Sequence, residues 1–272
     1  VGGGARGEEV PETTLVLEQV TVDRERLAAY DRVCGFPLRD QLPATYPHML
    51  AFPLHLALMT DPAFPFPALG LVHIANRIVQ HCRLAADEPV SIRVWATPLE
   101  PHPRGTQLTL RSEARVGEKL VWEEASTILK RGKAPEGRPH GSENETHSQQ
   151  RREGEGRGLP VTATWRLPGD LGRRYGSVSG DLNPIHIHPV SARLFGFPTA
   201  IAHGMWTKAR CLAALDPRLP DAFTVEVEFR KPILLPATVE FGELESAGEG
   251  IRFGVRGAGK STPHLDGLVS FG

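Results

Sequence analysis

Residues 177–205 concentrate the polar side chains that could carry out chemistry in this chain. Asp181 and His186 are separated by Asn183-Pro184, whose restricted backbone disfavours helix and turns the chain. We expect this turn to aim both side chains into one cavity. An imidazole titrates near neutral pH, and a carboxylate can fix the orientation of a water molecule. The pair therefore predicts general acid–base catalysis on a bound water.

Gly204 adds a third element, because it begins an apolar stretch, residues 204–215, that is expected to be helical. The N-terminus of a helix presents free N–H groups and a partial positive charge. A carbonyl oxygen that gains negative charge during a reaction could be stabilised there, and glycine would allow its close approach. The pattern therefore favours a substrate with a reacting carbonyl group.

Other histidines have different expected roles. His188 is expected to be a surface or turn residue, and His203 to pack or form a hydrogen bond near the helix start. Alternating histidines beside a carboxylate also suit zinc or iron. A metal would leave Pro184 and the glycine-led helix unexplained, so no metal is predicted. Four histidines lack a carboxylate at a spacing that indicates chemistry: His48, His55, His73 and His81.

The composition excludes several classes of function. Lys and Arg total 31 against 32 Asp and Glu, which leaves no strong field to attract nucleic acid or an anionic membrane. The 3 cysteines form no zinc motif and favour a reducing cytoplasm. The most apolar stretch, residues 49–59, is too short to span a bilayer. We expect a cytoplasmic protein, and because the sequence begins with Val, we expect the encoded N-terminus to lie further upstream.

The chain divides into two units of similar size. Residues 131–158 contain no Val, Ile, Leu, Met or aromatic residue, so burial cannot offset their ordering entropy. They are predicted to form a mobile linker between residues 12–130 and residues 159–272. Each unit has the same predicted order, an apolar helix followed by antiparallel strands, and the helical stretches 48–62 and 203–217 both run from His to Pro. This indicates an internal duplication and an α+β fold in which each sheet wraps around its helix.

Short elements are expected to position the polar cluster. Residues 161–167 are predicted to form a strand, and residues 171–179 a short helix with Asp170 as its N-cap and Gly180 at its end. Asp181 therefore falls in a loop just past a helix C-terminus. Pro189 is expected to open another short helix.

The string of residues around the cluster resembles a known family motif. Without a gap from Tyr175 to Met205, the chain is closely similar to MaoC-like hydratases, which include (R)-specific enoyl-CoA hydratases and 3-hydroxyacyl-thioester dehydratases. The matching residues are Tyr175, Ser179-Gly180-Asp181, Asn183-Pro184, His186, Ala192, Phe195 and His203-Gly204-Met205. The resemblance implies a double hot-dog fold, in which the N-terminal unit has lost the catalytic motif and shapes the acyl pocket.

The resemblance also implies roles for the matching residues. Asp181 and His186 would activate the water that adds to a trans-2-enoyl thioester, giving the (R)-3-hydroxyacyl product, or would run the reverse dehydration. No cofactor would be needed, because the thioester acidifies the α-hydrogen and CoA, or the phosphopantetheine arm of acyl carrier protein, arrives with the substrate. Four residues are predicted to bind or support the substrate: Ser179, Asn183, His203 and Gly204.

Two other functions stay open at this point. Thioester hydrolysis is supported by the same fold and would release a free thiol. A non-catalytic acyl-thioester-binding protein would bind substrate analogues without turnover, and Asp181 and His186 would then be a turn cap and a surface histidine. Arg77 and Arg230 could contact CoA phosphates or simply end strands. The sequence leaves open the acyl group, the carrier, the direction of reaction, and the choice between a monomer and a homodimer.

Overall fold

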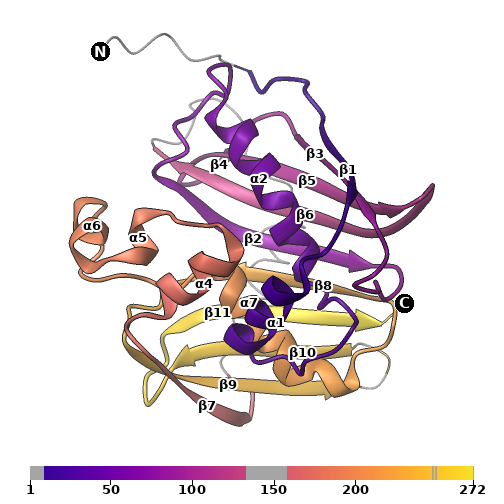
Figure 1. The fold of residues 1–272 in the computed structure, drawn as a ribbon. Coiled ribbons are helices and arrows are strands. Elements are labelled where there is room, and N and C mark those ends of the chain that lie inside the picture. The colour runs from indigo at the N-terminus through magenta and orange to yellow at the C-terminus, as the bar shows by residue number, and fades with distance from the viewer. Residues whose placement is uncertain (1–8, 133–157, 247, 249, 272) are drawn as a thin grey trace.

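A single antiparallel sheet runs through both halves of the chain. The computed structural model describes residues 9–132, 158–246, 248 and 250–271. Within them, 11 strands form one sheet in the order β1-β3-β5-β6-β2-β8-β11-β10-β9-β7, with β4 paired to β5. The first half of the chain supplies β1 to β6 and the second half supplies β7 to β11 (Figure 1). The two halves therefore meet where β2 pairs with β8.

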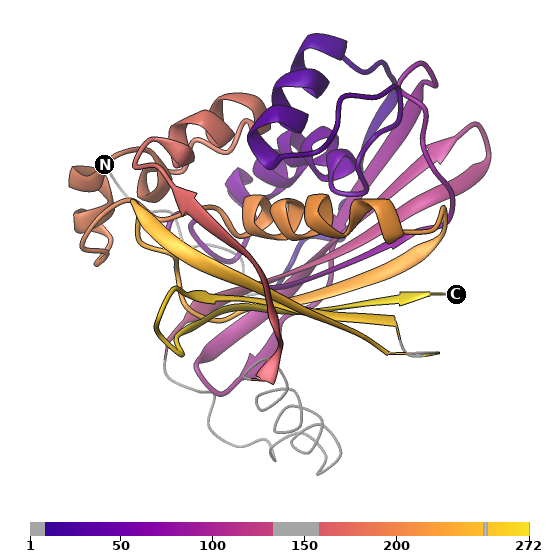
Figure 2. The same cartoon turned by 90° about the horizontal axis from the view of Figure 1, so that it is seen from below.

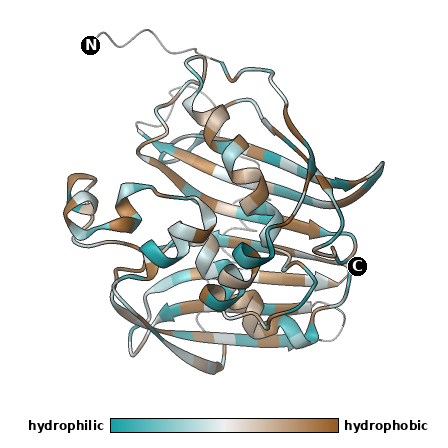
Figure 3. Cartoon of the chain, in the orientation of Figure 1, coloured by the Kyte–Doolittle hydropathy of each residue, from teal (hydrophilic) through white to brown (hydrophobic). Residues whose placement is uncertain are grey.

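Residues 161–167, which were predicted to form a strand, form β7, and antiparallel strands follow the apolar helix in each half as predicted, whereas β1 and β4 were not predicted. Figure 3 shows that apolar and polar residues alternate along the strands, which is typical of a sheet with one covered face. The first half contains β1 (Leu15–Val20), β2 (Leu71–Gln80), β3 (Val90–Ala96), β4 (Glu100–His102), β5 (Gly105–Val116) and β6 (Lys119–Arg131). The second half contains β7 (Val161–Leu167), β8 (Phe223–Phe229), β9 (Ala237–Ser246), β10 (Gly250–Gly257) and β11 (Pro263–Phe271).

Two long helices lie on the same face of the sheet, one in each half (Figure 2). Helix α2 (Tyr46–Thr60) contacts β1, β3 and β5, and helix α7 (Gly204–Leu215) lies against the second half of the sheet. Both were predicted, and each buries apolar residues, among them Met49, Ala51 and Leu58 of α2 and Met205, Trp206 and Leu212 of α7. The α+β architecture expected from the duplication is therefore present. No helix in the described part of the chain is long and apolar enough to cross a membrane.

Helix α1 (Arg24–Cys34) was not predicted, although its start and stop signals are present in the sequence. Asp23 accepts hydrogen bonds from two backbone N–H groups of the first turn, and Gly35 ends the helix with φ 84°. The helix contacts both α4 and α7 of the second half. Most of the predicted linker, residues 133–157, lies outside the described residues.

A buried carboxyl group lies on α1. Asp31 is 1% exposed, and its Oδ1 has no hydrogen-bond partner among the described residues. Burial raises the pKa of Asp31 from 3.8 to about 7, although Arg39 lowers it. The folded state therefore binds this proton more tightly than the unfolded state does.

We expect Asp31 to make the protein less stable as the pH rises. Its stabilising contribution is complete below about pH 4 and is lost as the pH rises through about 7. The change in pKa corresponds to at most about 4 kcal/mol. Asp31→Asn should therefore raise the free energy of unfolding at pH 8 and flatten its dependence on pH, as measured by urea denaturation at several pH values. An unchanged pH dependence in the variant would contradict this assignment.

Candidate active site

The loop that carries Asp181 follows helix α4 (Leu171–Ser179), which ends at Gly180 with φ 83°, as predicted. Asp170 stands at the N-cap position, but the prediction that its side chain caps the helix was wrong, because it makes no capping hydrogen bond. At the other end, the guanidinium of Arg26 on α1 donates through Nε to the carbonyl oxygen of Val178 at 2.7 Å. This contact places a cation at the helix C-terminus, where it is favourable.

Glycines on α4 allow the backbone of the following loop to pack directly on the helix. A Cβ at Gly172 would lie 1.9 Å from the carbonyl oxygen of His186, and one at Gly176 would lie 2.9 Å from that of Asp181. Residues four apart share one face of a helix, so the two glycines leave part of one face of α4 without side chains. The spacing of Gly172 and Gly176 is the signal in the sequence for this contact, which was not predicted.

His186 lies on a one-turn helix, α5 (Pro184–Ile187), rather than in the predicted turn. The side chain of Asn183 caps this helix by accepting the N–H of Ile185. Pro184 occupies the first helical position, where the missing N–H has no partner to lose and the fixed φ suits the helix. The sequence interpretation was therefore wrong locally, because proline breaks the interior of a helix but favours its start.

The structure brings Asp181, His186 and His203 together. One nitrogen or oxygen of each side chain lies within 4.8 Å of the other two. The Nδ1 of His186 lies 2.8 Å from the carbonyl oxygen of Ile201. A carbonyl only accepts, so Nδ1 carries the proton and Nε2 is left as an acceptor. The rings of His186 and His203 stack with centroids 3.7 Å apart.

Three of the predicted residues fix the position of Asp181 through hydrogen bonds. His203 donates from Nε2 to the carbonyl oxygen of Asp181 at 3.0 Å and lies 3.7 Å from its Oδ2. The hydroxyl of Ser179 accepts the N–H of Asp181, and Asp181 Oδ1 accepts the N–H of Asn183, each at 3.1 Å. The carboxylate is held by its surroundings but stays 29% exposed. Substrate contact by Ser179, Asn183 and His203 remains a prediction.

Gly204 is the first residue of α7, as predicted, and His203 is the N-cap residue. The N–H of Gly204 has no hydrogen-bond partner in the part of the chain that the structure describes. A Cβ at this position would lie 3.0 Å from the ring of Phe229. A larger residue at this position would therefore crowd the ring of Phe229, while the N–H of Gly204 remains available to a ligand.

Both histidines of the cluster are neutral at neutral pH. Burial lowers the pKa of His186, although Asp181 opposes this change. Burial lowers the pKa of His203 to about 3, and the neighbouring His186 adds to the effect. A carboxylate and a neutral imidazole acceptor can together hold one water molecule and remove a proton from it. The same atoms could also approach a metal ion, although no metal was predicted here.

Other sequence candidates lie apart from this cluster. His188 is exposed and its ring accepts a backbone N–H as the N-cap of α6 (Pro189–Leu194), which confirms that it is a surface residue. Arg77 pairs with Glu226 at 3.3 Å, and Arg230 pairs with Asp266 at 2.7 Å. Both guanidinium groups are therefore already paired with carboxylates.

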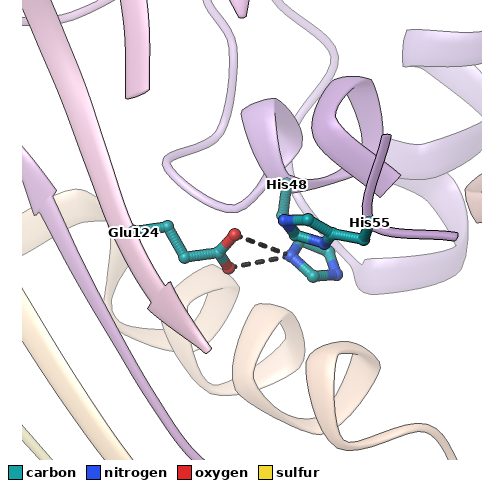
Figure 4. Close-up of side chains that lie close together, drawn as sticks. All are labelled: His48, His55 and Glu124. Atoms are coloured by element: carbon teal, nitrogen blue, oxygen red, sulfur yellow. Dashed lines mark hydrogen bonds and ion pairs between the residues drawn. The ribbon is translucent and has the colours of Figure 1, made fainter. Parts of the chain in front are cut away.

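A second polar cluster was missed by the sequence analysis. His48, on α2, lies 2.8 Å through Nδ1 from Glu124, on β6, and His55 lies close by (Figure 4). His81 also has a carboxylate partner, Glu123, at 2.6 Å. The carboxylate partners of His48 and His81 do not appear as a short spacing in the sequence, because Glu124 lies 76 residues from His48 and Glu123 lies 42 residues from His81, and only the tertiary fold joins them.

Comparisons with known proteins show which family this chain resembles. Residues 149–259 match the family model described as MaoC like domain. The chain is 37% identical over 265 residues to 3-hydroxyacyl-thioester dehydratase X of Mycobacterium tuberculosis, covering 97% of this chain and 91% of that protein. The crystal structure of HtdX from the same organism has a TM-score of 0.81 at 37% identity, covering 95% of this chain and 99% of that chain.

A more distant structure shows the fold alone. A Mycobacterium tuberculosis protein described as having a double hotdog fold is 14% identical, with a TM-score of 0.51 and coverage of 95% and 96% of the two chains. Together with the HtdX structure, this likeness confirms the double hot-dog fold expected from the sequence.

Proposed function

Because this chain belongs to the family of MaoC-like dehydratases, we propose that it interconverts trans-2-enoyl thioesters and (R)-3-hydroxyacyl thioesters by adding or removing water. The observation that supports this proposal best is the fixed tautomer of His186. Its Nδ1–H is held by the carbonyl of Ile201, so that Nε2 is left as an acceptor, and one nitrogen of the ring lies within 4.8 Å of a carboxylate oxygen of Asp181.

In the proposed hydration, Asp181 and Nε2 of His186 each accept a hydrogen bond from one water molecule. As the water oxygen attacks the β-carbon, one of these two groups takes one proton from the water, and one proton is returned to the α-carbon, so that OH and H add across the double bond. The reverse sequence removes water. The N–H of Gly204 would donate to the thioester oxygen as negative charge develops there. These steps require no cofactor, because the thioester itself acidifies the α-hydrogen.

The remaining parts of the proposal concern the substrate carrier, the two units and the location. CoA or acyl carrier protein would carry the acyl group, and residues 12–130 would shape the acyl pocket while residues 159–272 hold the catalytic groups.

The three cysteines are free in the structure, and two of them are buried. This state suits the cytoplasmic location that the sequence predicts.

The test is an assay that separates hydration from hydrolysis. The protein is mixed with a trans-2-enoyl-CoA, and the loss of enoyl-thioester absorbance is followed together with free thiol. Loss of absorbance without thiol release, giving the (R)-3-hydroxyacyl product on chiral analysis, is the expected result. Release of thiol in step with the loss of absorbance would instead identify a hydrolase, and binding without any turnover would identify a binding protein.

The pH dependence of this activity follows from the state of His186. Its imidazole must be neutral to accept a proton, and burial holds its pKa below 6.5. We expect kcat/KM for hydration to be constant from about pH 6.5 to 8 and to fall only at lower pH. A pH–rate profile with a trans-2-enoyl-CoA measures this, and a decline that begins above pH 7 would contradict it.

A further inference from the structure

The segment that holds His186 projects from the rest of the molecule. Helices α5 and α6 lie at one edge of the molecule in both views of the ribbon (Figure 1, Figure 2). They contain 4 and 6 residues, which correspond to lengths of about 6 and 9 Å. The hydroxyl of Ser191 on α6 donates to the carbonyl oxygen of Pro184 on α5 at 2.7 Å. The two helices therefore form one small unit that also contains a catalytic histidine.

This unit carries the most exposed apolar side chains of the described chain. Leu194 is 82% exposed, Leu182 is 65% exposed and Val190 is 59% exposed, more than any other large apolar side chain in the described ranges. Val190 and Leu194 are four residues apart on α6 and share one of its faces. A Cβ at Gly176 would lie 3.2 Å from Ile187 and 3.5 Å from Leu182, so these two side chains lie next to each other on α4. Exposed apolar side chains gathered in this way are typical of an interaction surface.

Unpaired positive charge accompanies these apolar side chains. Residues 171–199 contain a single acidic residue, Asp181, and three arginines: Arg173, Arg174 and Arg193. The three are exposed, and none forms an ion pair with a carboxylate of the described residues. Arg173 donates to the carbonyl oxygen of Ile187 at 3.3 Å, and Arg193 donates to that of Pro198 at 3.1 Å. We refer to the following side chains together as the α5–α6 surface: Leu182, Val190, Leu194, Arg173, Arg174 and Arg193.

The combination of apolar and positively charged side chains limits what this surface can bind. A second copy of the chain is a poor match, because the same surface meets itself in a two-fold dimer and arginines would face arginines. CoA is also a poor match, because its phosphates would pair with the arginines but leave the apolar side chains exposed to water. A small acidic protein matches both features, since its carboxylates pair with the arginines and its apolar side chains cover those of this surface.

We propose that the α5–α6 surface docks an acidic acyl carrier protein, which delivers the substrate on its phosphopantetheine arm. This inference rests on the proposed function and chooses between its two carriers. The location of the surface supports it, because Leu182 directly follows Asp181 and α5 contains His186. A protein docked on this surface stands beside the catalytic groups, so that its arm reaches them directly.

The experiment presents the same trans-2-enoyl group on CoA and on purified acyl carrier protein, and measures kcat/KM for each substrate. Leu194→Asp should lower kcat/KM for the carrier-linked substrate by about tenfold, an effect typical of a central interface residue. It should change kcat/KM for the CoA-linked substrate by less than about twofold, because the side chain is exposed. Activity with the CoA-linked substrate also shows that the variant is folded. Equal effects on both substrates, or no effect on either, would overturn the proposal.

Leu38→Asp is the matched control for Leu194→Asp. Leu38 is also strongly exposed, at 57%, and its neighbour Arg39 pairs with Asp216, which follows the last residue of α7. The 12 residues of α7 separate that end from Gly204 by about 18 Å. Leu38→Asp should therefore keep both kcat/KM values within about twofold of those of the unmodified protein.

Arg193→Glu tests the contribution of charge to docking. At low salt it should lower kcat/KM for the carrier-linked substrate by about tenfold, and the loss should shrink as NaCl is added, because salt screens exposed charges. The CoA-linked substrate should show neither the loss nor its dependence on salt. A loss of the same size with the CoA-linked substrate would mean that Arg193 acts on CoA itself, and it would overturn the docking role.

A binding measurement separates failure of docking from failure of the proposed function. Acyl carrier protein loaded with a saturated acyl chain cannot be hydrated, and its Kd can be measured by calorimetry. Binding that weakens in Leu194→Asp supports docking even if no enoyl thioester is turned over. Turnover of both substrates with no change of Kd in Leu194→Asp supports the dehydratase function and excludes docking.

Sedimentation velocity tests the other occupant of the surface. The sedimentation coefficient should be the same for the unmodified protein and Leu194→Asp. Conversion of a dimer into a monomer by Leu194→Asp, with unchanged kcat/KM for the carrier-linked substrate, would make the surface a contact between two copies of the chain and overturn the proposal.

Discussion

Asp181→Asn is expected to lower kcat for hydration of a trans-2-enoyl-CoA by about 10² to 10⁴-fold, the range for loss of a general acid–base group. The amide keeps the size of the side chain and can still face His203, but it cannot take a proton from the water held beside His186. His186→Gln should cause a loss of similar size. Because both residues act on one water, the double variant should lose little more than either single variant.

The measurement is steady-state hydration at saturating substrate, with thermal unfolding of each variant to verify the fold. His188→Asn is the matched control, since His188 is an exposed histidine two residues from His186 and asparagine can replace it as an N-cap. This control should retain activity within about twofold, because surface changes of this kind have small effects. A kcat of Asp181→Asn near that of the control would rule out the assignment of Asp181 as a catalytic group.

Gly172→Ala is expected to lower kcat for hydration by about 100-fold. This loss does not require contact between residue 172 and the substrate. The new Cβ would lie 1.9 Å from the carbonyl oxygen of His186, a distance at which the backbone must move. A displacement of about 1 Å in a catalytic group can cost about 10²-fold in rate. Overpacking of this kind also costs about 1–3 kcal/mol of stability, so activity is compared at a temperature where the variant is fully folded.

Gly169→Ala provides the control for this second prediction. It makes the same chemical change shortly before α4, but the nearest atom to its Cβ would be 3.9 Å away, which is an ordinary contact. Its kcat should be close to that of the unmodified protein. Normal kcat in Gly172→Ala would mean that α4 does not set the position of His186.

Much of the fold follows from local patterns in the sequence. Alternation in residues 223–229 predicts β8, and the glycine-led apolar run predicts α7, because both signals depend on neighbouring residues. The order of Asp181, Asn183 and His186 predicts the site for the same reason. These three residues are close in space because they are close in the chain.

The features that the sequence did not predict depend on contacts between distant residues. The way α2 packs against β6 brings Glu124 to His48, and the spacing of neighbouring residues in the sequence does not reveal this packing. The Arg26 contact with Val178 joins residues 152 apart. Helix α5 was missed for a different reason, since the rule that proline disfavours helix was applied without its exception at the first helical position.

The pairing of β2 with β8 places the two halves in one continuous hydrogen-bonded sheet. Six residue pairs, from Ala75 opposite Glu228 to Gln80 opposite Phe223, form this joint. In this respect the molecule is equivalent to a heterodimer whose subunits have been fused into one polypeptide. Fusion fixes the ratio of the half with the Asp181 motif to the half without it at one to one. The half without the motif can therefore change its interior while a complete catalytic set is retained in every molecule.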